Sequence, residues 1–225
     1  MQRRLVRLLG LMTMINLSLI AILLFAFYFP LSLPWKNRFL TQREVAACLS
    51  QLETGDFSDR CDALNQLIDA HAEEELASRL AFRDPSTALL ARQGLQECWL
   101  EEEGPAARAQ MEEGIQALHL GQLKAAEAIF ADLNEHYPKW VEVSNRMAAV
   151  LYYEGRMAES LALCRKVVAL KPHHFGAWNG MAQCAIELQD WTTAIEASRM
   201  GLKLSPGSYQ NRERLRFAEA QLIRL

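Results

Sequence analysis

The feature that most constrains the fold of this chain is a sequence pattern that recurs at an interval of 34 residues. Each of three units has a proline at the same place: Pro138, Pro172 and Pro206. The units are residues 107–140, 141–174 and 175–208. A unit of this length holds two short helices, which cannot bury an apolar face alone. We therefore expect the units to stack on one another.

The positions that recur within each unit have a physical explanation in a helical hairpin. The eighth and twentieth positions are always small: Gly114, Ala148 and Ala182, then Ala126, Ser160 and Ala194. Two antiparallel helices approach closely only where both present little side chain. Near the middle, Gly121 and Gly155 can supply the left-handed backbone that ends a first helix, and Gln189 takes that place in the third unit. The pattern predicts six antiparallel helices between Ala107 and Ser208.

The period and its markers resemble the tetratricopeptide repeat (TPR) family, with Trp178 at the fourth position of the third unit and Phe130 at the twenty-fourth of the first. The stretches NRMAAVLYYEGRMAESL and KPHHFGAWNGMA are similar to a membrane-anchored bacterial and plastid subgroup with a helical region ahead of the repeats. The resemblance implies an all-α fold, a TPR-type α-solenoid of helical hairpins. The chain departs from the family at positions where larger or aromatic side chains are usual: Gln110, Ser144, Cys164 and Ser198.

The N-terminal segment predicts a membrane anchor. No charged residue occurs from Leu8 to Leu33, and residues 8–29 meet the length of about 20 apolar residues that a bilayer-spanning helix needs. A cleaved signal peptide is disfavoured, because its apolar core is usually about 7–15 residues and ends at small residues. Here the bulky stretch FYFPLSLPW follows. We therefore expect one N-terminal transmembrane helix that contacts the lipid bilayer through residues 8–29.

The orientation of this anchor rests on two opposing observations. The basic residues flank the apolar segment almost evenly: Arg3, Arg4 and Arg7 precede it, and Lys36, Arg38 and Arg43 follow it. With the α-amino group added, they slightly favour a cytoplasmic N-terminus, which would place the soluble part on the other side of the membrane. The five cysteines are scattered over apolar helix faces and indicate buried thiols in a reducing compartment. On balance we expect a single-pass membrane protein with its soluble part on the cytoplasmic side. A Cys48–Cys61 or Cys164–Cys184 disulfide is the alternative.

The chain divides into four parts: a 1–35 anchor, a 36–106 helical region, the 107–208 repeats and a 209–225 capping helix. Residues 41–74 could form a degenerate repeat. Within 36–106 the pattern predicts a helix over 41–53, a turn at 54–57 and a longer helix that carries the leucines from Leu64 to Leu80. Asp84 is expected to cap the next helix, with proline at its first position.

Composition and motifs disfavour several functions. Without the three arginines ahead of the anchor the chain is clearly acidic, although its net charge is only −3, which argues against nucleic acid as a partner. No CxxC pair, Cys/His metal spacing or nucleophile motif occurs. The side chains of His173 and His174 should diverge, and His174 is expected to shape the loop between repeats. We expect no enzyme activity, metal or cofactor.

The resemblance implies that the first helices of stacked hairpins line a concave groove that binds a protein or peptide. Tyr152, Tyr153, Asn145 and Asn179 are expected to contribute most, since tyrosines give contact area at low entropic cost. Five positions per unit usually face this groove in the family, which predicts the groove residues Arg108, Met111, Ile115, Leu118, His119, Glu142, Asn145, Ala149, Tyr152, Tyr153, Gly176, Asn179, Gln183, Ile186 and Glu187.

One familiar ligand of such grooves, a chaperone C-terminal tail, is disfavoured. The positions that carry its carboxylate clamp in the family hold Met111, Ile115, Gly176 and Gly180 here. A more apolar peptide or helix is expected instead. The sequence thus predicts a non-catalytic, membrane-anchored scaffold or adaptor, of the kind that assists assembly of membrane complexes. The alternatives are a regulatory or accessory subunit of an enzyme and a homo-oligomerising structural protein.

Overall fold

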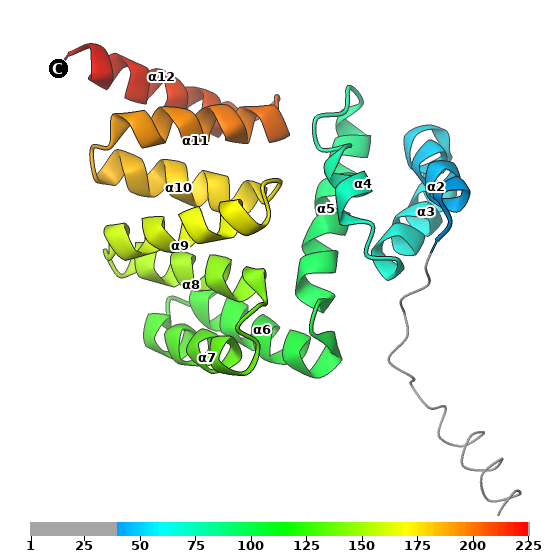
Figure 1. Cartoon of the computed structure of the whole chain (residues 1–225), viewed down its shortest axis with the longest axis horizontal. Coiled ribbons are helices and arrows are strands. Elements are labelled where there is room, and N and C mark those ends of the chain that lie inside the picture. The colour runs from blue at the N-terminus through cyan, green and yellow to red at the C-terminus, as the bar shows by residue number, and fades with distance from the viewer. Residues whose placement is uncertain (1–39, 225) are drawn as a thin grey trace, which may run out of the picture. The chain divides into compact units, whose positions relative to one another are not determined.

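The computed structural model describes residues 40–224, and these are all-helical apart from short turns (Figure 1). The predicted 1–35 domain, with its membrane helix at 8–29, lies outside the described residues. None of the described helices is long and apolar enough to cross a membrane. The helices are α2 (Gln42–Thr54), α3 (Phe57–Asp69), α4 (Glu73–Ala77), α5 (Pro85–Glu101), α6 (Gly104–His119), α7 (Leu123–His136), α8 (Val141–Tyr153), α9 (Met157–Leu170), α10 (Phe175–Glu187), α11 (Trp191–Leu204) and α12 (Tyr209–Ile223).

Helices α6 to α11 form three antiparallel hairpins that stack in chain order, and α12 packs on the last of them (Figure 1). The small residues at the eighth and twentieth positions are all buried, as predicted. An added Cβ at Gly114 would lie 2.5 Å from Cε1 of Phe130. The hydroxyl of Ser160 donates a hydrogen bond of 2.7 Å to the carbonyl of Ala148 on the facing helix. Close helix approach thus depends on these small side chains.

The turns inside the hairpins have the predicted left-handed backbone. Gly121 and Gly155 have φ angles of 72° and 80°, and a Cβ added to either would meet nothing within 4 Å. Gln189 takes the same conformation in the third hairpin, with φ of 57°. These residues therefore serve to reverse the backbone rather than to make space for a neighbour.

The helices ahead of the repeats form a separate hydrophobic cluster around Leu52, Leu67 and Leu95. The prediction of one longer helix from Leu64 to Leu80 is wrong. The chain leaves the helical conformation after Asp69, where His71 adopts a left-handed φ of 49°, and becomes helical again in the short α4. A straight helix would carry Leu80 about 20 Å beyond Leu67, whereas the break returns Leu80 to the same cluster.

Two further predictions for this region can be compared with the structure. Asp84 caps α5 by accepting a hydrogen bond from the backbone of Thr87, with proline in the first turn, as predicted. Helices α2 and α3 form a hairpin that turns at Gly55 and Asp56. The assignment of residues 41–74 as a degenerate repeat stays a prediction.

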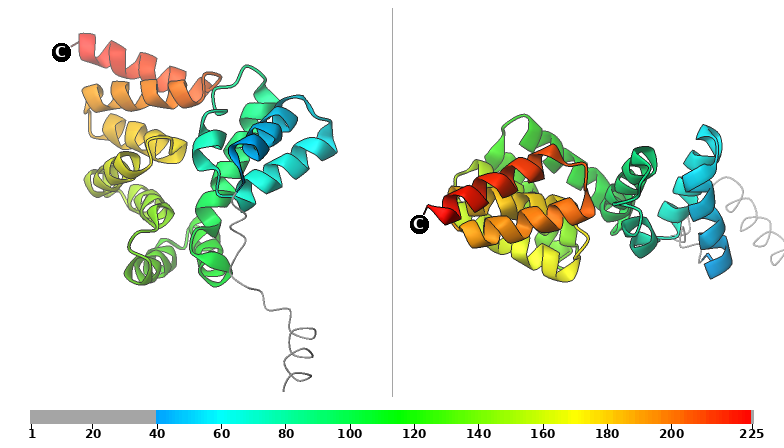
Figure 2. Two further views of the ribbon diagram at one scale, coloured as in Figure 1. Left: turned by 45° about the vertical axis from the view of Figure 1, so that its right-hand side comes forward. Right: turned by 90° about the horizontal axis from the view of Figure 1, so that it is seen from above.

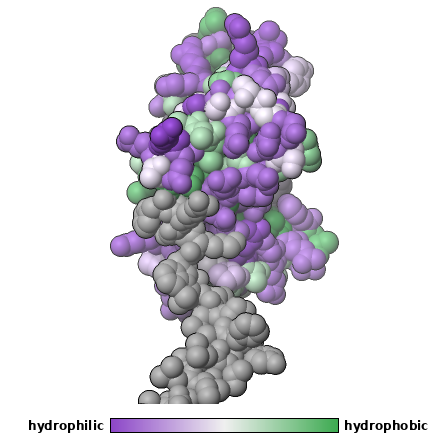
Figure 3. All heavy atoms as spheres, turned by 90° about the vertical axis from the view of Figure 1, so that its right-hand side faces the viewer, coloured by the Kyte–Doolittle hydropathy of each residue, from purple (hydrophilic) through white to green (hydrophobic). Residues whose placement is uncertain are grey.

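Helix α5 lies beside the repeats, at the end where α9 connects to α10 (Figures 1 and 2). Phe175, the first residue of α10, belongs to the same cluster as Leu95 and Trp99 of α5. The indole of Trp140 donates a hydrogen bond of 2.7 Å to the carbonyl of Trp99. On the side of α2 and α3 the surface is mainly hydrophilic, with scattered hydrophobic side chains (Figure 3). The apolar contacts of these helices are thus directed inward and toward the repeats.

The last helix, α12, covers part of the third hairpin. Ala218 is buried and Leu215 packs against the same cluster. Arg214 is half-buried and donates a hydrogen bond to the side chain of Asn211. Leu222, near the end of the helix, is 44% exposed. The covered face of α12 therefore includes Arg214 as well as Leu215 and Ala218, and it does not extend to Leu222.

The cysteines form no disulfide within residues 40–224, which include all five of them. Four are buried and Cys61 is half-buried. The thiol of Cys184 donates to the hydroxyl of Ser160, with 3.1 Å between the sulfur and the oxygen. These side chains fill helix interfaces, and neither alternative disulfide is present.

Candidate functional site

The predicted groove residues lie on α6, α8 and α10, which we call the A helices. The N-terminal ends of the A helices face α4 and α5, and we call this the closed end. Their C-terminal ends lead into the hairpin turns on the far side of the molecule from α5, and we call this the open end (Figure 1). The two ends differ in burial and in charge.

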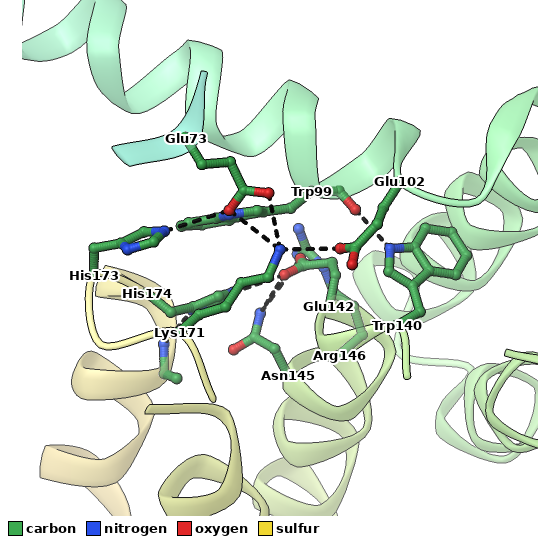
Figure 4. A network of polar contacts seen from close by, with 11 residues as sticks. Glu73, Trp99, Glu102, Trp140, Glu142, Asn145, Arg146, Lys171, His173 and His174 are labelled. Carbon is green, nitrogen blue, oxygen red and sulfur yellow. Dashed lines mark hydrogen bonds and ion pairs between the residues drawn. The ribbon is translucent and has the colours of Figure 1, made fainter. Parts of the chain in front are cut away.

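Glu142 lies at the closed end and is buried, with 2% of its side chain exposed. One carboxylate oxygen is 2.6 Å from Nε of Arg146, and the other is 2.9 Å from Nε2 of His174 (Figure 4). Asn145 donates a longer hydrogen bond of 3.3 Å to the same carboxylate. Burial acts to raise the pKa of Glu142, but Arg146 and His174 outweigh it and hold that pKa below its ordinary value. Contrary to the prediction, Glu142 is a structural residue that a partner cannot reach.

His174 holds the loop between the second and third repeats, as predicted. Its Nδ1 accepts a hydrogen bond of 3.1 Å from the backbone N–H of Ala177 and so caps α10. The ring proton must then be on Nε2, which donates it to Glu142. The imidazole stacks on the indole of Trp99, with ring centroids 4.1 Å apart. The side chain of His173 diverges from it and points to Glu73 (Figure 4).

A second charged network joins α4 and α5 to the repeats. Nζ of Lys171 lies 3.0 Å from a carboxylate oxygen of Glu73 and 3.0 Å from one of Glu102 (Figure 4). The indole of Trp99 donates a hydrogen bond of 2.9 Å to Glu73. Burial acts to raise the pKa of Glu73, but the hydrogen bond from His173 and the charge of Lys171 lower that pKa to about 2. Glu73 is therefore ionised at neutral pH and fixes the closed end electrostatically.

The first repeat is tied to α5 in the same way. The guanidinium of Arg108 lies 2.9 Å from Glu97 and 2.8 Å from Glu101, both on α5, and 2.8 Å from Glu112. Arg108 is thus occupied by the chain's own carboxylates. Met111, another predicted groove residue, is fully buried in the repeat core. Neither side chain is available to a partner at this end.

The remaining predicted residues are more accessible. Ile115 and Ile186 are half-buried against core clusters, and Asn179 and Gln183 are half-buried as well. Tyr153 is 65% exposed, and its ring meets that of Tyr152 edge-on, with centroids 5.6 Å apart. His119 is exposed. The structure thus places Tyr152, Tyr153 and His119 at the open end.

Three side chains at this end were not predicted. Leu120 and Leu188, the residues that follow α6 and α10, are 65% and 42% exposed. They occupy the same place in their repeats, directly after the thirteenth position, so the repeat alignment holds the signal that identifies them. Arg214 of α12 is close enough to Tyr152 for its positive charge to act on that side chain. Burial and the charge of Glu187 raise the pKa of Tyr152, so its hydroxyl stays protonated at neutral pH.

The A helices present side chains suited to noncovalent contact. Across residues 40–224 no group of three or more His, Cys, Asp or Glu side chains could hold a metal ion. At the closed end Arg108, Glu142 and Lys171 are paired with other charged side chains of the chain, and the open end offers aromatic and aliphatic side chains. The arrangement suits contact with another polypeptide.

Comparison with known proteins shows similarity in fold. No protein-family model and no curated protein matches this chain. The solved structure of the first TPR of Spaghetti (RPAP3), bound to the HSP90 peptide SRMEEVD, aligns with 52% of this chain and 93% of its own, with a TM-score of 0.50 and 19% identity. The TPR domain of P58(IPK) aligns with 81% of this chain and 66% of its own, with a TM-score of 0.50 and 14% identity.

A double mutant of MamA is also similar, at a TM-score of 0.48 and 20% identity over 67% of this chain and 83% of its own. The two structures with TM-scores of 0.50 are TPR domains. Together with the stacked hairpins of α6 to α11, they show that this chain has the all-α, TPR-like helical-repeat fold that the sequence predicts.

Proposed function

We propose that this chain is a non-catalytic scaffold that holds a protein or peptide partner against the open end of its A helices. The observation that carries this proposal is a row of exposed apolar side chains at the same end of three successive A helices: Leu120, Tyr153 and Leu188. The chain's own helices α4 and α5 occupy the other end. The partner is therefore expected to contact the far half of the predicted groove.

The chemistry of this row indicates the class of partner. Exposed apolar side chains that recur at one end of a repeat array are typical of interaction surfaces, and tyrosine is enriched among residues that dominate binding energy. An apolar peptide or an amphipathic helix fits it. The solved RPAP3 domain binds an HSP90 peptide, but in this chain the clamp position Met111 is buried and uncharged. A chaperone tail bound through that clamp is disfavoured.

Tyr153→Ala tests the proposal, with Phe57→Ala as the control. Phe57 is an exposed aromatic residue (84%) but begins α3, ahead of the repeats and away from the open end. Twelve-residue peptides would first be selected from a display library against the full chain in lipid nanodiscs, and the affinity of the best binder measured by fluorescence anisotropy. Tyr153→Ala should weaken binding about tenfold or more, and Phe57→Ala should leave it unchanged. Equal affinities for all three proteins would contradict the proposal.

Membrane anchoring is the second part of the proposal. The uncharged segment at residues 8–29 supports it, and the thiols of the body favour a cytoplasmic location for the scaffold. Anchoring would restrict the search for a partner to the membrane surface, which suits assembly of a membrane complex. The full chain should resist alkaline extraction from membranes, whereas a chain lacking residues 1–35 should be released. Release of both would exclude the anchor.

A second candidate function, self-association through α12, is favoured by one observation. Phe217, Leu222 and Ile223 are 47%, 44% and 85% exposed at the end of the repeat array. Stacking of two such ends would cover them. Light scattering of the full chain in detergent decides the matter: a monomer that persists as protein concentration rises excludes this candidate.

A further inference from the structure

A cavity of about 250 Å³ lies where α5 meets α10 and the loop between α11 and α12. It is partly open to solvent, and its wall is mostly polar. The polar side chains that line it come from four segments of the chain: Arg92, Asn179, Ser205, Ser208, Gln210 and Asn211. The volume is below the range of about 300–1,000 Å³ typical of drug-sized ligands. It suits one residue of a longer ligand.

Arg92 is the only cation in the wall of this cavity. Its guanidinium carbon lies 4.0 Å from the centre of the Phe175 ring, on which it stacks. No carboxylate of the described residues pairs with Arg92, whereas Arg108 and Arg156 each contact three. Burial lowers the pKa of Arg92 without any neighbouring charge to oppose it. A half-buried cation that lacks a counter-ion is costly.

Asn179 contributes a second unsatisfied group. Its Oδ1 atom is buried and accepts no hydrogen bond from the described residues. A buried acceptor in this state costs about 1–3 kcal/mol. Because Oδ1 is shielded from solvent, a donor in the cavity can satisfy it only if the Asn179 amide rotates toward the cavity. Backbone N–H groups of a peptide are such donors. Among the residues that the structure describes, Arg92 thus has no anionic partner, and Oδ1 of Asn179 has no hydrogen-bond donor.

The start of α12 adds a favourable field. Ser208 caps this helix of 15 residues, and Gln210 and Asn211 lie in its first turn. The N-terminus of a helix carries a partial positive charge and attracts anions. Asn211 is buried, and its side chain already accepts a hydrogen bond from Arg214. The field thus has the same sign as the charge of Arg92.

We propose that this cavity receives a carboxylate of a peptide, with the Arg92 guanidinium as its counter-ion and the Asn179 amide, once rotated toward the cavity, as acceptor for the adjacent backbone N–H. The proposal rests on the peptide-binding function and deepens it. Planar guanidinium suits a carboxylate because two parallel hydrogen bonds can form. The site lies outside the family's clamp positions, since Arg92 belongs to the helices ahead of the repeats. The carboxylate can be a chain terminus or an acidic side chain.

Three small probes distinguish these sources. N-acetyl-leucine carries a terminal carboxylate next to an N–H group, N-acetyl-glutamate α-amide carries a side-chain carboxylate, and N-acetyl-leucine amide carries neither. Each would be titrated into the full ¹⁵N-labelled chain in detergent micelles and followed by NMR at the Asn179 side-chain amide and the backbone of residues 208–211. A dissociation constant of about 1–10 mM is expected for the acids. The tighter of the two acids identifies the source.

Variants connect the binding to Arg92. Arg92→Gln should weaken binding of the acids about tenfold, the equivalent of about 1.4 kcal/mol. Arg43→Gln, the same charge change at an exposed residue of α2, should leave it unchanged. Arg92→Lys keeps the positive charge but not the planar guanidinium, and this variant should bind the acids with intermediate affinity. It provides a second test in case Arg92→Gln does not fold. Circular dichroism checks the fold of each variant.

The inference is overturned if the neutral amide binds as well as the acids, if residues 208–211 show no shift at about 50 mM probe, or if both Arg92 variants bind like the unmodified chain. Any of these results leaves Tyr153-dependent peptide binding in place, so the proposed function would stand. Conversely, binding of the acids without any effect of Tyr153→Ala on peptides would support the carboxylate site and contradict the open end as the main surface.

Discussion

Gly114 shows how a single missing side chain permits a helix pair. A Cβ there would meet Cε1 of Phe130 at 2.5 Å and Cγ2 of Ile129 at 3.0 Å, and both belong to the facing helix α7. Phe130 is fully buried and cannot turn away from α6 without leaving the core. The glycine is therefore required for close approach, although it costs about 0.5–1 kcal/mol of helix stability relative to alanine.

Gly114→Ala should destabilise the chain by about 1–2 kcal/mol. Overpacking of a filled core costs about 1–3 kcal/mol, and the gain in helix propensity offsets part of it. Urea denaturation of the full chain in detergent, followed by circular dichroism, measures the change. Gly207→Ala is the control, because a Cβ at that position meets nothing within 4 Å. Equal stability of the two variants would refute the packing argument.

The site residues show where a prediction from the position within a repeat fails. The repeat alignment places Glu142 and Tyr153 correctly on α8, but it does not say what covers them. Glu142 is buried beside His174, on which Trp99 stacks, while Tyr153 remains exposed. No pattern within the repeat predicts this arrangement, because Trp99, which stacks on His174, precedes the repeats in the chain. Position along a helix was predictable and accessibility was not.

Among the elements, the hairpin turns depend on backbone conformation alone. Gly121, Gly155 and Gln189 adopt left-handed φ angles at equivalent places. The backbone N–H groups of Gly155 and Arg156 donate to carbonyls of α8 and satisfy its last turn. The sequence predicted these turns because glycine marks them locally. The break between α3 and α4 was missed, since His71 gives no such signal.

Gly155→Ala should cost about 1 kcal/mol of stability. A left-handed alanine costs about 1–2 kcal/mol, and the smaller entropy of its unfolded chain offsets part of this. The loss should be measured by the same denaturation experiment. Gln189→Gly, the reverse change at the equivalent place, should not destabilise by a comparable amount. If both changes cost the same, side-chain contacts rather than backbone conformation control the turns.

For the whole molecule, the contact between α4–α5 and the repeats depends on ionised carboxylates. The pKa of Glu73 falls from an ordinary 4.5 to about 2, because His173 and Lys171 outweigh the effect of burial. A carboxyl group with a lowered folded-state pKa stabilises the fold above its unfolded-state pKa. This stabilisation is lost as the pH falls from about 4.5 toward about 2.

Glu73→Gln should therefore flatten the pH dependence of stability between pH 4.5 and 2.5. At pH 7 the variant should lose about 2–3 kcal/mol, since Lys171 loses one of its two partners. Denaturation at a series of pH values gives both quantities. Glu74→Gln is the matched control, because the side chain of Glu74 is 86% exposed. An unchanged acid slope in Glu73→Gln would show that other groups control the junction.

The sequence by itself determined the helical-hairpin repeat, since small residues, glycines and prolines act within 34 residues of one another. These are short-range constraints on backbone and helix packing, and a periodic pattern reports them directly. Only the tertiary structure decided which end of the A helices is open. That choice depends on contacts such as Lys171 with Glu73, which lie 98 residues apart. Such pairs form only when the chain folds back on itself, and no local pattern encodes them.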